Sequence, residues 1–319
     1  MEWVAASAPS SSANLGPGFD TLAVALDLYW DRVWARRSDT PGVRVVEVEG
    51  EWAGQSGGGA TAARAVEALL ELLGLEDAGV ELRVEKGVPP GRGLGSSGAS
   101  AAAAVVAASR ALGVRPSASV LVEAAGRGEA AAAGSPHYDN VAASVLGGFV
   151  ALARGLDESL RVTRVPVSGG MYFAVVTPMG RVPESKTMVM RSVLPESVGL
   201  GEAVANWSRL AVMVAALASG DLRLAGEMMS GDGIVEPRRS RFIECYGEAR
   251  QAALEAGAYG FAISGAGPSM IALAGSRGQA ERVVEAMLGS CRWSVEPLAG
   301  VATPAGGALE SPGEGAESI

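Results

Sequence analysis

The strongest constraint on the fold is a glycine-rich segment between a predicted strand and an alanine-rich run. Residues 91–98 read Gly-Arg-Gly-Leu-Gly-Ser-Ser-Gly, residues 80–86 alternate apolar and charged side chains, and residues 100–112 are mostly alanine. The alternation predicts a half-buried strand, and alanine has the highest helix propensity. Glycines let successive backbone N–H groups wrap an anion, and the N-terminal end of the following helix adds positive potential. The segment therefore predicts a strand, a loop and a helix that together hold phosphate.

Residues 93–98 also match the pattern Gly-x-Gly-x-x-Gly of dinucleotide-binding turns, which leaves a second interpretation open. In such a turn the glycines follow the strand directly, and an acidic residue lies about 20 positions later. Here residues 87–92 separate the strand from the pattern, and residues 111–116 contain no acid. A third interpretation is a turn that only lets the strand pack against the helix.

The rest of the chain predicts two domains, because 319 residues with 48% hydrophobic and 19% charged side chains can form two cores. In the first half, we expect a strand over 43–48 and a helix over 60–73 that ends at Gly74. In the second half we expect an α+β layer of the split βαβ kind, with strands over 171–177, 259–264, 270–274 and 292–298 and helices over 201–218, 240–256 and 279–288. We place the domains at residues 1–160 and 161–302. The tail, residues 303–319, is expected to be disordered because Gly, Pro, Ser and Glu dominate it.

Composition and charge exclude several classes of function. The net charge of −9 argues against binding to nucleic acid or an anionic membrane, and no apolar run reaches the ~20 residues of a membrane span. We therefore expect neither partner, and a cytoplasmic location. Cys245 and Cys291 lack CxxC spacing and are expected to be buried thiols. The single histidine, His137, excludes a multi-histidine metal centre.

The glycine-rich segment resembles a known motif. From Pro89 to Ser100 it keeps every fixed position of the second motif of the GHMP kinases, Pro-x-x-x-Gly-Leu-Gly-Ser-Ser-x-x-Ser. Residues 264–269, Ser-Gly-Ala-Gly-Pro-Ser, resemble the third motif, although such a turn is also a common hairpin. The resemblance implies that ATP is bound by Lys86 and a continuous set of loop residues: Pro89, Pro90, Gly91, Arg92, Gly93, Leu94, Gly95, Ser96, Ser97, Gly98 and Ala99. From the residues alone, Lys86 is equally a solvated strand end.

Near the amino terminus, residues 12–20 read Ser-Ala-Asn-Leu-Gly-Pro-Gly-Phe-Asp and join an amide and a carboxylate to a tight turn. A carboxylate pairs with an ammonium group, and an amide both donates and accepts hydrogen bonds, which suits an amino alcohol. An Asx-type turn capped by Asp20 is the alternative. The segment resembles the first GHMP motif in the form found in homoserine kinases, and residues 137–140, His-Tyr-Asp-Asn, resemble the His-x-Asp-Asn segment of that family.

The homoserine kinase resemblance assigns substrate binding and catalysis. It implies that L-homoserine is bound by residues spread over the whole chain: Asn14, Asp20, His137, Asn140, Thr187, Arg191, Arg239 and Gly265. Catalysis is assigned to Asn140, Asp139 and Arg191. From the residues alone, His137 is equally a hydrogen-bonded structural residue, and each arginine is equally a solvated surface charge. The usual Ser-Thr-Lys order of the family is altered here to Glu184-Ser185-Lys186-Thr187.

The same resemblance implies that Ser97 and Glu129 hold Mg²⁺, an ion that prefers oxygen ligands. It implies an α+β, two-domain GHMP kinase fold, with an N-terminal domain like ribosomal protein S5 domain 2 and a C-terminal ferredoxin-like α/β layer. The implied reaction is ATP-dependent phosphorylation of the hydroxyl of L-homoserine, which gives O-phospho-L-homoserine and ADP in threonine biosynthesis. ATP and Mg²⁺ are the implied cofactors, and a homodimer is the expected assembly.

Three alternatives to this function remain open. The first is a GHMP kinase for another small alcohol, mevalonate or shikimate, and the second is a catalytically inactive ligand sensor of the same fold. A nucleotide-dependent oxidoreductase comes last. The role of Asp139 as a base is also open, because phosphoryl transfer depends mainly on positioning and charge neutralisation.

Overall fold

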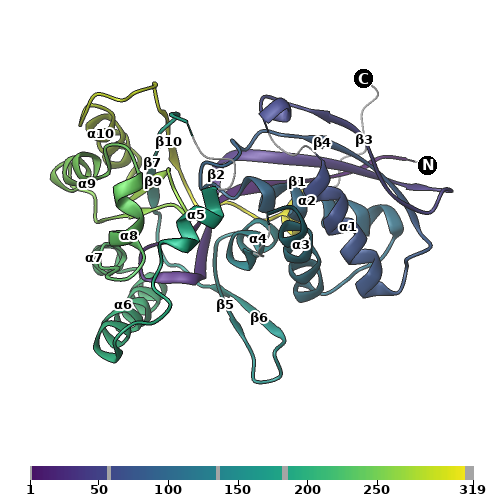
Figure 1. Cartoon of the computed structure of the whole chain (residues 1–319), viewed down its shortest axis with the longest axis horizontal. Helices are drawn as coiled ribbons and strands as arrows, with labels where there is room; N and C mark the ends of the chain where they lie inside the picture. Colours follow the sequence, from purple (N-terminus) through teal and green to yellow (C-terminus); the bar gives the residue numbers. More distant parts are fainter. Residues whose placement is uncertain (1, 56–58, 134–136, 182–185, 313–319) are drawn as a thin grey trace.

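The computed structural model describes residues 2–55, 59–133, 137–181 and 186–312, which form two α+β domains (Figure 1). The first sheet has the strand order β3-β4-β2-β5-β6, and β1 pairs with β2. All its neighbours are antiparallel except β3 and β4. Its strands are β1 (Val4–Asn14), β2 (Gly18–Ser38), β3 (Gly42–Glu49), β4 (Gly79–Glu85), β5 (Phe149–Arg154) and β6 (Leu160–Val165).

Four helices cover this sheet: α1 (Ala60–Leu73), α2 (Ser96–Leu112), α3 (Ala118–Ala133) and α4 (Tyr138–Leu146). The alanine-rich α2 lies in the middle and contacts β1, β2 and the other three helices. Residues 101–104, all alanine, have no exposed surface. Small side chains let these elements approach α2 from every side, so the helix that follows the glycine-rich segment is fixed in the core of the domain.

The second domain is built on an antiparallel sheet with the order β10-β7-β9-β8. Its strands are β7 (Tyr172–Thr177), β8 (Gly260–Ile263), β9 (Met270–Ala274) and β10 (Leu298–Ala302). Helices α9 (Tyr246–Glu255) and α10 (Arg277–Leu288) pack against it, and α5 (Lys186–Ser192), α6 (Leu200–Ser219), α7 (Leu222–Met229) and α8 (Glu236–Arg239) come between β7 and β8. The order strand, helices, two strands, helix, strand is that of a ferredoxin-like layer.

The first two strands form a long hairpin whose tip reaches the second domain (Figure 1). At the tip, Gly16 has a φ angle of 79°, and a Cβ there would lie 1.9 Å from Met229 O of α7. Asn206 of α6 donates to Pro17 O at 3.4 Å. Only glycine fits the position of Gly16, and the hairpin tip carries the first motif into the space between the domains.

The fold class is confirmed, but two element boundaries differ from the sequence predictions. Strand β6 also pairs with β5 across residue 160, at which the sequence placed the end of the first domain. The last strand was expected over residues 292–298, and β10 instead spans Leu298–Ala302. The helix expected over residues 240–256 is shorter, since α9 begins at Tyr246.

The prediction that the tail from residue 303 is disordered is wrong for residues 303–312. Pro304 forms a β-bridge with Leu26, Gly306 forms one with Gly147, and Ala308 is fully buried. The tail therefore leaves the second domain and packs on the first, because its small apolar residues fit between β2 and α4. Residues 313–319 of the same prediction lie outside the described residues, as do Glu184 and Ser185.

The two cysteines form a disulfide and are not the buried thiols that the sequence predicted. Cys245 lies at the start of α9 and Cys291 follows α10, and their Cα atoms are 6.2 Å apart. The packing of α9 against α10 brings together two residues that are 46 positions apart in the sequence. Within the described ranges, no helix is both long and apolar enough to cross a membrane.

Candidate active site

The glycine-rich loop approaches its neighbours so closely that side chains would not fit. A Cβ on Gly93 would lie 2.3 Å from Ser264 O, and a Cβ on Gly95 would lie 2.1 Å from Ser11 Oγ. Both glycines have positive φ angles, 82° and 68°. The hydroxyl of Ser264 donates to Gly93 O at 2.7 Å. The loop is therefore held between β1 and the turn that follows β8, which is the third motif.

Helix α2 begins directly after this loop, at Ser96, and no side chain caps its first turn. The first N–H groups of a helix have no partner within the helix, and together with the helix dipole they attract an anion. Beside them, Ser97 Oγ donates to Glu129 Oε1 of α3 at 2.5 Å. The end of the loop thus offers N–H donors for phosphate next to a pair of oxygen ligands.

Arg92 ties the loop to the second domain. Its guanidinium donates to Pro178 O at 3.0 Å and to Gly180 O at 2.8 Å, just after β7. Burial lowers the pKa of this guanidinium. The side chain of Arg92 therefore points across the domain boundary and is occupied by these two carbonyl groups.

Lys86, which the sequence analysis assigned to ATP binding, is enclosed beneath the loop. It is buried, its ammonium group pairs with the carboxylate of Asp31 on β2, and it donates to Ser100 Oγ at 2.6 Å. The other oxygen of Asp31 accepts the N–H groups of Gly87 at 3.0 Å and Val88 at 2.9 Å. The pair fixes both ends of the loop, and no sequence pattern pointed to Asp31.

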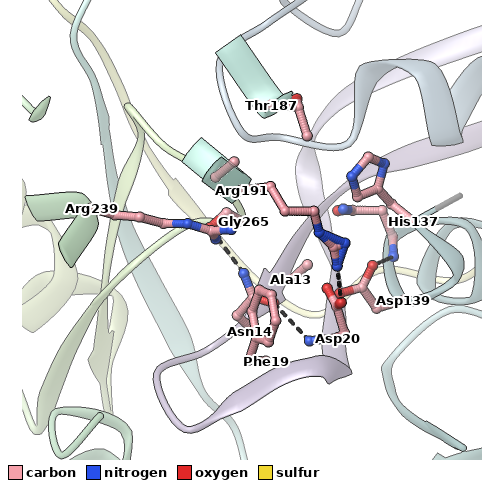
Figure 2. A pocket seen from close by; sticks show the side chains of 12 residues that line it. Ala13, Asn14, Phe19, Asp20, His137, Asp139, Thr187, Arg191, Arg239 and Gly265 are labelled. Carbon is pink, nitrogen blue, oxygen red and sulfur yellow. Dashed lines mark hydrogen bonds and ion pairs between the residues drawn. The ribbon is translucent and has the colours of Figure 1, made fainter. Parts of the chain in front are cut away.

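A small pocket opens between the two domains (Figure 2). It lies beside the glycine-rich loop, since a Cβ on Gly95 would be 3.0 Å from Asn140 Oδ1. The structure brings into its lining every residue that the sequence assigned to substrate binding or catalysis: Asn14, Asp20, His137, Asp139, Asn140, Thr187, Arg191, Arg239 and Gly265.

The hairpin tip supplies the amide and the carboxylate of the pocket. Asn14 and Asp20 both have left-handed backbone angles, with φ of 73° and 53°. Asn14 Nδ2 donates to Gly265 O at 2.9 Å, and Asn14 Oδ1 accepts the N–H of Asp20 at 3.1 Å. The carboxylate of Asp20 pairs with Arg191 of α5, and both side chains remain substantially exposed, at 46% and 40%. Figure 2 shows this pair among the side chains that line the pocket.

Two arginines meet around Phe19, which the sequence analysis did not single out. The guanidinium carbons of Arg191 and Arg239 lie 5.5 Å and 5.2 Å from the centre of its ring. Arg239 also donates to Gly265 O at 3.1 Å. Burial lowers the pKa of Arg239 to about 10, with Asp20 opposing the shift, so the group stays charged at neutral pH. Phe19, Ala13 and Ala266 complete the lining, and all three lie within motifs that the sequence showed.

On the opposite wall, α4 presents the His-x-Asp-Asn segment. Asp139 is buried, and this burial, together with the charge of Asp20, raises the pKa of its carboxyl to about 6. Burial alone would lower the pKa of His137, but its hydrogen bond to Glu129 and nearby carboxylates outweigh burial and raise it. Asn140 Oδ1 accepts a hydrogen bond from Ser11 Oγ at 2.9 Å, which orients the amide. At neutral pH Asp139 is mostly ionised and can accept a proton.

Comparisons with known proteins place these features in a wider group. The sequence profile of the GHMP kinases N terminal domain matches residues 43–148, and that of the GHMP kinases C terminal domain matches residues 213–291. The chain is 55% identical to the homoserine kinase of Aeropyrum pernix, over 95% of this chain and 96% of the other. It is 47% identical to the homoserine kinase of Pyrobaculum neutrophilum, over 85% and 88%.

Solved structures agree with this result. The crystal structure of homoserine kinase from Cytophaga hutchinsonii is similar, with a TM-score of 0.86, 35% identity and 98% of both chains covered. The mevalonate kinase of L. major, with a TM-score of 0.67 and 18% identity over 95% of this chain and 96% of the other, shares the fold.

The buried pair beneath the loop can be tested by removing its cation. Lys86→Met leaves Asp31 as a buried charge without a counter-ion, which should cost about 3–5 kcal/mol of unfolding free energy. The double variant Lys86→Met with Asp31→Asn removes both charges and should regain part of this loss. Urea denaturation of the unmodified protein, the single variant and the double variant measures the free energy of unfolding of each. A single variant within about 0.5 kcal/mol of the unmodified protein would contradict the role of the pair.

Proposed function

This chain belongs to the GHMP kinase family, among its homoserine kinases, and we propose that it transfers the γ-phosphate of ATP to the hydroxyl of L-homoserine. The products are O-phospho-L-homoserine and ADP. The observation that carries the proposal is the meeting, in one pocket beside the glycine-rich loop, of an exposed carboxylate, two arginines and an amide. These groups can bind the ammonium and the carboxylate of an amino acid and leave its hydroxyl near the loop.

We assign the recognition of the amino acid to the Asp20–Arg191 pair and to Arg239. The carboxylate of Asp20 binds the substrate ammonium, and the planar guanidinium groups of Arg191 and Arg239 bind the substrate carboxylate through paired hydrogen bonds. Asn14 holds Asp20 and the Gly265 carbonyl in place through its two hydrogen bonds. His137 and Thr187 border the pocket on the side of the first domain and α5. The substrate is thus oriented before the phosphoryl group is transferred.

We assign the triphosphate to the backbone N–H groups of residues 91–99 and to the N-terminal end of α2. Mg²⁺ fits beside them, because Ser97 Oγ and Glu129 Oε1 form an adjacent pair of oxygen ligands. No described residues form a group of three or more His, Cys, Asp or Glu that could hold a metal, so phosphate and water would complete the coordination. The bound ion would neutralise negative charge on the phosphates.

For the reaction itself, we place the substrate hydroxyl against Asn140 and Asp139. Asn140 is oriented by Ser11 and lies next to Gly95 of the loop, so it can position the hydroxyl for attack on phosphorus. Asp139 is buried and mostly ionised at neutral pH, and it can accept the proton that the hydroxyl loses. Arg191 stabilises the negative charge that moves onto the transferred group.

The function is tested by ADP release with ATP and Mg²⁺ against L-homoserine, L-threonine, mevalonate, shikimate and galactose. We expect homoserine to be preferred over mevalonate, shikimate and galactose by well over tenfold in kcat/KM, or about 1.4 kcal/mol, because only an amino acid satisfies both Asp20 and the arginines. Asp20→Asn should reduce this preference over mevalonate. A preference for another alcohol would contradict the substrate assignment, and a complete lack of ATP consumption would favour an inactive sensor.

The proposed Mg²⁺ ligands are tested by Ser97→Ala and Glu129→Gln. Each variant should lower kcat by at least about 100-fold while the fold is retained, since it removes an oxygen ligand beside the phosphates. Two matched controls should keep their activity: Ser109→Ala, at the far end of the same helix as Ser97, and Glu123→Gln, on the same helix as Glu129. If Ser97→Ala or Glu129→Gln kept an activity close to that of the unmodified protein, the proposal that this residue binds Mg²⁺ would be contradicted.

We also propose a homodimer formed through an apolar face of α6. Leu200, Val204 and Trp207 recur at helical spacing and are 75%, 42% and 54% exposed, and exposed alanines continue this face toward Ser219. A stripe of this kind can pack against the same stripe of a second copy around a two-fold axis. Sedimentation should therefore show a dimer that Trp207→Glu converts to a monomer and Ser208→Glu leaves intact. A monomeric unmodified protein would contradict this proposal.

A further inference from the structure

The chain contains two lysines, Lys86 and Lys186, against 24 arginines. Both lysines are buried, with exposed fractions of 2% and 7%, whereas the exposed cations of the described residues are arginines. Lysine is therefore present only where a compact ammonium group is enclosed by protein. Lys86 is accounted for by its ion pair with Asp31. Lys186 has no such explanation.

Lys186 is the first residue of α5, and its ammonium group donates to the backbone carbonyl of Gly267 in the third motif. Among the described residues, no carboxylate lies within ion-pair distance of it. The charged groups that act on it are the guanidinium groups of Arg239 and Arg92, which repel it. Burial, and then these two arginines, lower the pKa of Lys186 to about 7. A buried cation between two other cations is costly unless an anion joins them.

The position of the ammonium group indicates which anion this is. The next residue, Thr187, lines the substrate pocket, but Lys186 does not, so its side chain lies on another side of α5. Its partner Gly267 O would be 2.7 Å from a Cβ on Gly93. The ammonium group therefore lies where the third motif meets the glycine-rich loop, on the phosphate side of the site and not on the side that holds Asp20.

We propose that Lys186 is a phosphate ligand, whose ammonium group binds a terminal phosphate oxygen of ATP at the junction of the glycine-rich loop and the third motif. This inference rests on the proposed kinase function, and it names a residue that deepens that function. A phosphate oxygen can accept a hydrogen bond from the compact ammonium group of lysine, which carries three donors and a full positive charge. When phosphate binds, Lys186 exchanges its single carbonyl partner for an anion shared with neighbouring loop N–H groups.

Lysine labelled with ¹³C and ¹⁵N provides a direct test, because the unmodified protein has two lysine side chains and Lys186→Arg identifies their signals. A non-hydrolysable ATP analogue with Mg²⁺ should raise the pKa of the Lys186 ammonium group, followed through its signal, by about one unit or more. The pKa of Lys86 should stay unchanged. Homoserine alone should leave both signals in place. Inorganic pyrophosphate should shift Lys186 in the same direction. An unchanged Lys186 signal with the analogue, or an equal shift with homoserine alone, would overturn the inference.

Kinetics provide the second test. Lys186→Met should lower kcat/KM for ATP by about tenfold or more, with a KM for homoserine within about threefold of the unmodified value, and Lys186→Arg should restore part of the loss. A loss confined to the KM of homoserine would place Lys186 on the substrate and overturn the inference. The labelling experiment does not require turnover. If no alcohol is phosphorylated but the analogue still shifts Lys186, the kinase function fails and the phosphate ligand stands; if homoserine is phosphorylated and Lys186 does not respond, only the phosphate ligand fails.

Discussion

The buried ion pair of Asp31 and Lys86 is the interaction on which the position of the glycine-rich loop depends. Asp31 comes from the middle of the long strand β2, and Lys86 follows the strand β4 that pairs with it. The carboxylate of Asp31 accepts hydrogen bonds from two backbone N–H groups at the start of the loop, from the ammonium group of Lys86 and from the hydroxyl of Ser100 in α2. Desolvation of two charges is repaid only when their remaining hydrogen bonds are also made, as they are here. The sheet, the loop and the helix are therefore fixed relative to one another before any ligand binds.

The second domain closes the site from the other side, and its contacts with the loop are equally specific. Arg92 reaches the carbonyls after β7, and Ser264 donates to the loop carbonyl at Gly93. The hairpin tip enters between α6 and α7, so the first motif is shaped by residues of the second domain. Neither domain alone contains a complete pocket, because its carboxylate comes from the first domain and its arginines come from the second.

The sequence predicted the site more accurately than the elements that carry it. Glycines, carboxylates and arginines in fixed patterns report local chemistry, and all nine residues predicted for substrate and catalysis line one pocket. Strand β1 gave no signal, because its run of alanine, serine and proline is buried almost throughout and does not alternate. The strand predicted over residues 292–298 does not form before Leu298, and the indole N–H of Trp293 instead donates to Leu288 O at the end of α10. The ion pair of Lys86 was not predicted because its partner, Asp31, is distant in sequence and belongs to no motif.

The proposed roles of Asp20 and Arg191 imply a physical basis for selecting an amino acid over an acid of similar size. Without a ligand, each charge neutralises the other across the pocket. An amino acid has both an ammonium and a carboxylate group. Asp20 can therefore pair with the ammonium and Arg191 with the carboxylate, so that neither side chain is left unpaired. A hydroxy acid such as mevalonate offers only the carboxylate, and binding to Arg191 would leave Asp20 beside the buried, mostly ionised Asp139 without its ion-pair partner. Like-charge repulsion in a partly desolvated site is costly, so discrimination arises from the partner that is missing as much as from the contacts that form.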